Sequence, residues 1–183
     1  MELSNQEAAL LGLLSEEAMH PYKIEQEVQY RDMRSWTGLS MSSIYKLLRK
    51  LEKNGLVLRE NKISEENRLQ KLYSISPKGA NALKVKLESL LREPEHMQWQ
   101  VDIGLYNSNL LTSDILQNSL REYRSALQKK AQGYRDLLQF LKDHQCDPHR
   151  FEVAKRPVFL IEAEIAWVDS YLQTLNLREG AYE

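Results

Sequence analysis

The first 55 residues contain three segments in which apolar side chains recur with helical spacing. The first begins with a capping box, Ser4-Asn5-Gln6-Glu7, and the second with Pro21, whose missing N–H costs nothing in a first helical turn. The third extends from the serine-rich stretch 40–43 to Asn54 and is stopped by Gly55. Its apolar residues stand at i, i+3, i+4 and i+7, namely Ile44, Leu47, Leu48 and Leu51. The pattern predicts three helices, the third of them amphipathic.

After Gly55 the spacing changes to that of short strands. Residues 56–59 and 71–75 predict the two strands of a hairpin, and the polar stretch 61–69 between them predicts a projecting loop. Ser76-Pro77 then begins a fourth helix. Three helices, a hairpin and a further helix together predict a winged helix-turn-helix followed by a linker helix.

The second half has the spacing of a helical hairpin. Thr112-Ser113-Asp114 caps a long helix, and Asp147-Pro148 begins another, which contains Pro157. In the first helix the apolar positions alternate four and three apart, except that Lys130 fills one of them: Leu116, Leu120, Tyr123, Leu127, Tyr134, Leu137 and Leu141. In the second the alternation falls on Leu160, Ala163, Trp167, Ser170 and Thr174, flanked by Phe159, Ala166 and Tyr171. Two such helices predict an antiparallel, coiled-coil-like pair that is too thin to bury its own apolar faces and needs a partner.

The fold class is therefore mainly α with a small β-hairpin. The best internal boundary is Glu93-Pro94-Glu95, because a proline between two acids interrupts helical periodicity on both sides. We expect a winged helix domain with its linker helix over residues 1–92 and a helical dimerisation domain over residues 93–183. Residues 96–107 fit both a strand and a helix, and periodicity leaves that choice open.

Charge differs between the two halves, although the chain as a whole has a net charge of −1. Residues 1–92 sum to +3 and residues 93–183 to −4, and the segment 44–78 has 9 basic against 4 acidic side chains. A basic segment within a neutral chain is typical of a small nucleic-acid-binding module. The single cysteine allows no internal disulfide, and no signal peptide or membrane-spanning apolar run is present, so we expect a soluble, cytoplasmic protein.

The third helix has the composition of a DNA recognition helix. Its apolar side faces the core, so its first turns are free to meet base edges and phosphates. Serine and tyrosine hydroxyls can bond phosphate or base edges, and arginine can bond guanine with two hydrogen bonds. The candidate DNA-binding residues on this helix are Ser42, Ser43, Tyr45, Lys46, Arg49 and Lys50, and those on the wing are Arg68 and Lys71, with Lys62 beside them.

Four stretches of the chain resemble the PadR-like transcriptional regulators. They are LLGLL at 10–14, MHPYKI at 19–24, SSIYKLLRKLEKNGLV at 42–57 and KLYSISPKG at 71–79. The stretch AEIAWV at 163–168 also resembles the last helix of the family, and the long C-terminal half resembles its larger members, including the virulence-activator type. The chain departs from the family pattern at Pro21, at Lys46 and in the wing, where NRLQK at 67–71 replaces Gly-Arg-Pro-Arg-Lys.

The resemblance implies a homodimeric, sequence-specific regulator of transcription, more often a repressor than an activator. It implies that Tyr45 with Ser42 and Ser43 contacts operator DNA, and that Arg68 and Lys71 serve the wing. For the dimer interface we expect the residues Leu116, Leu120, Tyr123, Leu127, Tyr134, Leu141, Trp167 and Tyr171. Relatives respond to small aromatic ligands, so we also expect Trp36 and Trp99 as candidates to line a slot for an aromatic effector.

Other functions have less support in the sequence. An enzyme would need a nucleophile with a base, a carboxylate pair or a phosphate-binding glycine loop, and none is visible, so no catalysis is expected. His144, Cys146 and His149 stand close together, but their spacing matches no standard zinc motif, so no metal or other cofactor is expected. The alternative that stays open is a coiled-coil adaptor whose winged helix binds protein rather than DNA.

Overall fold

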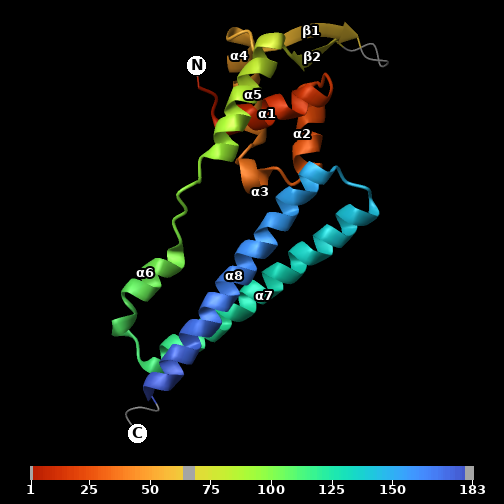
Figure 1. The fold of residues 1–183 in the computed structure, drawn as a ribbon. Coiled ribbons are helices and arrows are strands. Elements are labelled where there is room, and N and C mark those ends of the chain that lie inside the picture. Colours follow the sequence, from red (N-terminus) through yellow and green to blue (C-terminus); the bar gives the residue numbers. More distant parts are fainter. Residues whose placement is uncertain (1, 64–68, 180–183) are drawn as a thin grey trace. The chain divides into compact units, whose positions relative to one another are not determined.

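The computed structural model describes residues 2–63 and 69–179, and these form two compact units, Met1–Met97 and Gln98–Glu183. The elements of the first unit are α1 (Asn5–Glu16), α2 (Pro21–Tyr30), α3 (Arg34–Thr37), α4 (Met41–Lys53), β1 (Val57–Ile63), β2 (Leu69–Ile75) and α5 (Pro77–Arg92). Those of the second are α6 (Gln100–Tyr106), the 3-10 turn η1 (Ser108–Leu110), α7 (Ser113–Asp143) and α8 (Pro148–Glu179). Figure 1 labels all of them except η1. The fold is mainly helical with one two-stranded sheet, as the sequence predicts.

Helices α1, α2, α4 and α5 begin where the sequence predicts. Ser4 and Ser40 each form a capping box, and Ser76 caps α5 with Pro77 in its first turn. Helix α4 ends in a Schellman motif, in which the Leu56 N–H donates to the Leu51 carbonyl at 2.9 Å and Gly55 has a φ of 70°. The short helix α3, which follows α2 closely, was not predicted.

One core joins the helices of the first unit to the base of its hairpin. The fully buried side chains come from α1, α2, α4 and the loops that follow these helices, and include Leu10, Leu11, Leu14, Met19, Ile24, Ile44, Leu48, Leu51 and Leu56. Each large side chain of this kind stabilises the fold by about 1.5–3 kcal/mol relative to exposure. This core fixes which side of α4 faces inward.

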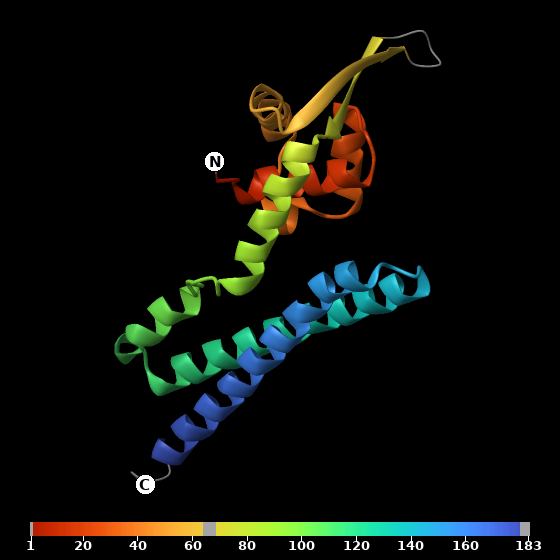
Figure 2. The ribbon, with the colours of Figure 1, turned by 45° about the horizontal axis from the view of Figure 1, so that its top comes forward.

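The hairpin strands are longer than the sequence predicts. Strands β1 and β2 pair antiparallel from Val57 opposite Ile75 to Ile63 opposite Leu69, so residues 61–63 and 69–70 are strand rather than loop. Beyond Val57 all side chains of β1 are exposed, whereas most of those of β2 are half-buried. Strand β1 therefore lacks the alternation of apolar and polar residues by which a half-buried strand is recognised. Figure 2 shows this hairpin extending away from the helices of its unit.

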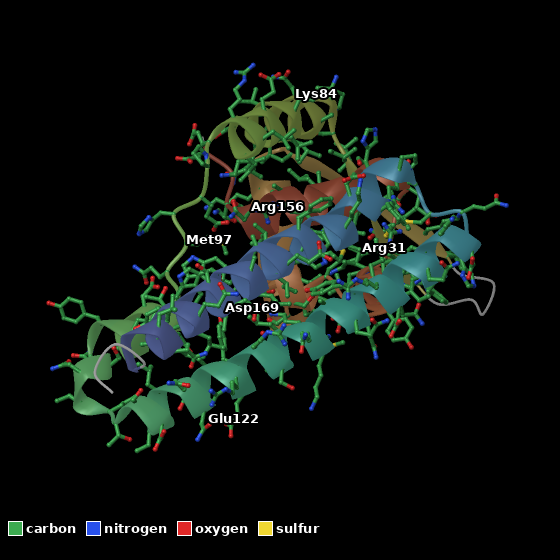
Figure 3. All side chains as sticks on the ribbon, turned by 60° about the horizontal axis from the view of Figure 1, so that its bottom comes forward. Arg31, Lys84, Met97, Glu122, Arg156 and Asp169 are labelled. Carbon is green, nitrogen blue, oxygen red and sulfur yellow. The ribbon has the colours of Figure 1, made fainter. Side chains whose placement is uncertain are left out.

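In the second unit, α7 and α8 lie side by side as an antiparallel pair (Figures 1 and 2). Polar contacts also join them: Tyr123 donates to Glu164 at 3.2 Å, Arg124 pairs with Asp169 at 2.5 Å, and Arg135 pairs with Glu162 at 2.6 Å. Asp169 is labelled on α8 in Figure 3. Residues 100–106, whose state the periodicity left open, are helical, and α8 continues through Pro157 without a break.

The face of α8 that packs on α7 is not the one that the sequence predicts. The buried residues of α8 are Ala154, Val158, Ile161 and Val168, whereas the predicted seam, Leu160, Ala163, Trp167, Ser170 and Thr174, is exposed. Two stripes with the same spacing exist on this helix, and the one without Ser170 and Thr174 is the more continuously apolar. On α7, Ala131 rather than Lys130 occupies the seam, and Leu138 rather than the exposed Leu137 lies half-buried. Helix α8 is therefore apolar on two faces, of which α7 covers one.

Within residues 2–63 and 69–179, no helix is both long enough and apolar enough to cross a membrane.

Candidate nucleic-acid interface

Helix α4 has one buried and one exposed face. Ile44, Leu47, Leu48 and Leu51 are buried, as their spacing predicts. The opposite side exposes a run of polar and basic residues: Ser42, Tyr45, Lys46, Arg49, Lys50 and Lys53. Tyr45 is 49% exposed, so its ring is available to a ligand and is not a core residue.

The serines at the start of α4 have different roles. The Ser43 hydroxyl donates to the Ser40 carbonyl at 2.7 Å and accepts from the Ser40 N–H at 2.8 Å. These bonds belong to the capping box that begins the helix, and Ser43 is half-buried. Ser42 is exposed, with its Oγ 3.2 Å from the Ser40 Oγ. Of the two serines, Ser42 is therefore the one that a ligand could reach directly.

Lys50 points toward α1. Its Nζ lies 2.8 Å from Oε1 of Glu7, a residue that is only 1% exposed. The other carboxylate oxygen, Oε2, accepts from the Ser4 N–H at 2.9 Å. Burial by itself would raise the pKa of Glu7, but Lys50 and the hydrogen bonds from Ser4 outweigh it, and the pKa is lowered. Glu7 is thus a buried carboxylate in its charged form. The capping-box pattern at residues 4–7 predicts the start of the helix but not this ion pair with Lys50.

The wing supplies further basic side chains. Lys62 and Lys71 are exposed, Lys71 opposite Asn61 and Lys62 opposite Gln70, whereas Arg68 lies outside the described residues. Arg59 of β1 was not singled out by the sequence, although it belongs to the basic segment 44–78. Its guanidinium lies 3.3 Å from the Glu52 carboxylate, which links the wing to α4. Helix α4 and the hairpin together form an exposed basic surface within one unit.

The two tryptophans considered for a ligand slot belong to different units. Trp36 lies on α3 in the first unit and is 56% exposed, and Trp99 immediately precedes α6 in the second and is 39% exposed. A hollow in the second unit is lined by residues of α7 and α8 and by neither tryptophan: Gln128, Ala131, Gln132, Arg135, Glu162 and Ile165. In the described parts of the chain, no three His, Cys, Asp or Glu side chains gather as metal ligands would.

The predicted dimer residues of α7 lie on the helix face that contacts α8 of the same chain. Leu120 is buried there, and Leu116, Tyr123, Leu127, Tyr134 and Leu141 are half-buried. On α8, Tyr171 is half-buried, and Trp167 stacks on it with ring centroids 6.0 Å apart while remaining 37% exposed. The intrachain seam thus accounts for the α7 residues, and Trp167 belongs to the uncovered face of α8.

A helix-turn-helix that is followed by a hairpin wing, with a basic exposed face on its last helix, defines the winged helix class of DNA-binding regulators. Residues 10–85 match the profile of the transcriptional regulator PadR-like family. This match confirms the resemblance to the family that was found in the sequence. The family is one of transcription regulators and not of enzymes.

Solved structures share the fold over nearly the whole chain. Bacillus subtilis PadR in complex with operator DNA is 19% identical, with a TM-score of 0.73 over 92% of this chain and 98% of that one. The same B. subtilis protein in complex with p-coumaric acid is 17% identical, with a TM-score of 0.75 over 94% and 99%. The Vibrio cholerae virulence activator AphA is 20% identical, with a TM-score of 0.66 over 94% and 99%. No curated protein sequence matches the chain.

Proposed function

We propose that this regulator binds a specific operator by placing α4 in the major groove of duplex DNA. The observation that carries the proposal is the exposed face of α4, where Ser42, Tyr45, Lys46 and Arg49 lie opposite a fully buried apolar face. Arg49 and Tyr45 suit base edges, and Lys46 suits phosphate. Lys62 and Lys71 of the wing add phosphate or minor-groove contacts. Its place of action is the cytoplasm.

The regulator acts as a homodimer whose dimerisation domain is the second unit. The support is the uncovered apolar stripe of α8, which includes Phe159, Leu160 and Trp167. In an aqueous setting such a stripe is stabilised by burial against a second copy. A two-fold dimer presents two recognition helices to half-sites about 34–36 Å apart.

Duplex binding as a function of salt concentration separates this function from that of a protein-binding adaptor. An operator is first enriched from a random duplex pool with the full chain, and its dissociation constant is then measured between 50 and 200 mM salt. Contacts to about 6–10 phosphates weaken binding by about 10³–10⁵ over that range. A chain that enriches no sequence and binds duplex poorly at every salt concentration is not an operator-binding protein.

We propose repression as the sign of regulation, with release from the operator by a small aromatic acid. The support is a neighbour of the same fold solved both with operator DNA and with p-coumaric acid. Transcription from a promoter that contains the enriched operator, with and without the protein, tests the sign. Titration with hydroxycinnamates, followed by tryptophan fluorescence and operator release, tests the effector and the involvement of Trp36 and Trp99. Quenching with no change in operator affinity would contradict release.

A further inference from the structure

We propose that Glu7 is a positioning residue for DNA recognition, and that Lys50 serves the operator by pairing with Glu7 rather than by contacting a phosphate. This inference rests on the proposed operator binding by α4. It assigns a role in recognition to a buried residue of α1 and changes the role of a lysine on the recognition helix.

The direction of the Lys50 side chain is the first argument. Lys50 belongs to α4 and its side chain is 56% exposed, yet its ammonium lies 2.8 Å from a carboxylate that is almost wholly buried. A phosphate contact would require Lys50 to leave Glu7 as an unpaired buried charge, which is costly. Lys50 is therefore held against the protein.

The rigidity of Glu7 is the second argument. One of its carboxylate oxygens accepts from the Ser4 N–H at 2.9 Å, and the Ser4 hydroxyl accepts from the Glu7 N–H at 3.2 Å. The capping box therefore fixes the Glu7 carboxylate at the first turn of α1. The Lys50 ammonium is thus paired with a carboxylate that does not move with α4. Further contacts tie the same end of α4: Arg59 to Glu52 at 3.3 Å, and Lys78 Nζ to the Asn54 carbonyl at 2.9 Å.

The distance along α4 between Lys50 and Ser42 makes the base-facing turn sensitive to the position of the Lys50 end. Ser42 precedes Lys50 by eight residues, which is about 12 Å along a helix. A rotation of about 5° around the Lys50 end would displace the base-facing turn by about 1 Å, and a hydrogen bond to a base edge tolerates less than that. Loss of the Glu7–Lys50 pair should then lower specific affinity more than non-specific affinity, because non-specific binding depends on phosphates alone.

The test uses the full chain with its enriched operator and a mixed-sequence duplex of the same length. Glu7→Gln should lower operator affinity about tenfold, which corresponds to one weakened base contact, and change mixed-sequence affinity less than about twofold. Lys50→Met should lower the ratio of operator to mixed-sequence affinity equally and leave the slope of log K against log salt unchanged. The double variant should lose no more than either single variant, because both remove the same pair.

The matched controls separate positioning from charge and from folding. Glu17→Gln removes one negative charge from the same unit, where Glu17 pairs with Lys23 at 2.7 Å, and should leave the ratio unchanged. Lys53→Met removes an exposed lysine one turn beyond Lys50 and should lower operator and mixed-sequence affinity together. A partly unfolded variant loses both affinities by the same factor, so the ratio is insensitive to stability.

Each result that would contradict the proposal points to a different failure. Glu7→Gln removes a negative charge near DNA, which by itself would raise the affinity for both duplexes. A Glu7→Gln variant whose ratio of operator to mixed-sequence affinity is unchanged overturns the proposal. A decrease of about 0.9 in the salt slope of Lys50→Met would show that Lys50 contacts a phosphate, and additive losses in the double variant would show that the residues act separately. Failure of the wild-type chain to enrich any operator would instead refute the proposed function.

Discussion

At the scale of single residues, Gly79 determines how closely α5 approaches the segment that follows α4. A Cβ at this position would lie 2.0 Å from the Leu56 carbonyl oxygen, a backbone atom that cannot rotate away. Gly79→Ala should therefore destabilise the first unit by about 1–3 kcal/mol in denaturant unfolding. Gly12→Ala in α1 is the matched control, because a Cβ there meets nothing within 4 Å. It should stabilise by about 0.5–1 kcal/mol, and equal effects of the two changes would contradict this account.

The ion pair between the buried Glu7 and the half-exposed Lys50 gives the stability of the first unit a pH dependence of known sign. The pKa of folded Glu7 lies below its ordinary value of 4.5, so its contribution to stability is complete above about pH 4.5 and is lost as the pH falls through the folded-state pKa. At pH 7, Glu7→Gln should lower the free energy of unfolding by about 1–3 kcal/mol. The loss is no larger, because water can still solvate the half-exposed Lys50 ammonium. Thermal unfolding of both proteins between pH 7 and 3 should show this difference shrinking below about pH 4.5. A difference that stays constant to pH 3 would contradict the pair.

At the scale of elements, the sequence predicts best where local chemistry alone decides the structure. The helix starts at the Ser4 capping box, in the serine-rich stretch 40–43 and at Ser76-Pro77, and the stop at Gly55, are local signals, and all four are confirmed. The buried face of α8 was predicted wrongly, because the choice between its two apolar stripes depends on which residues α7 presents to it. The short α3 and the longer strands have no periodic signal of their own. The pairing of Lys50 with Glu7 joins residues that are distant in the sequence, so no local pattern predicts it either.

Helix α4, the proposed recognition helix, offers a prediction that separates operator binding from folding stability. Tyr45→Ala and Arg49→Ala change exposed positions of α4, so each should leave unfolding within about 0.5 kcal/mol of wild type. Each should cost about 1–3 kcal/mol of operator affinity through a lost base contact. Ser40→Ala removes the N-cap of the same helix and should cost about 1 kcal/mol of stability. A sharp fall in the melting temperature of Tyr45→Ala with specific binding intact would place Tyr45 in the core.

At the scale of the whole molecule, the first unit exposes a basic surface on α4 and the hairpin, and the second exposes an apolar stripe on α8. The first unit has a closed core and an exposed charged face. In the second unit α7 covers only one apolar face of α8, so Phe159 and Trp167 stay exposed. In the proposed dimer, a second copy of the chain covers this face and so brings two copies of α4 together. Dimerisation and operator affinity should therefore change together.

Trp167→Arg tests that link. The side chain is 37% exposed and lies on the uncovered face of α8, so an arginine there is solvated in the monomer but buries an unpaired charge in a dimer. By sedimentation velocity at micromolar concentration, the wild type should be a dimer and the variant a monomer with unchanged helical content. The monomer reaches one half-site, so the salt slope of its binding should fall to about half. Val168→Ala is the control, because Val168 is buried within one chain: it should lower the unfolding temperature and leave the dimer intact. A Trp167→Arg variant that remains dimeric would place the interface elsewhere on the second unit.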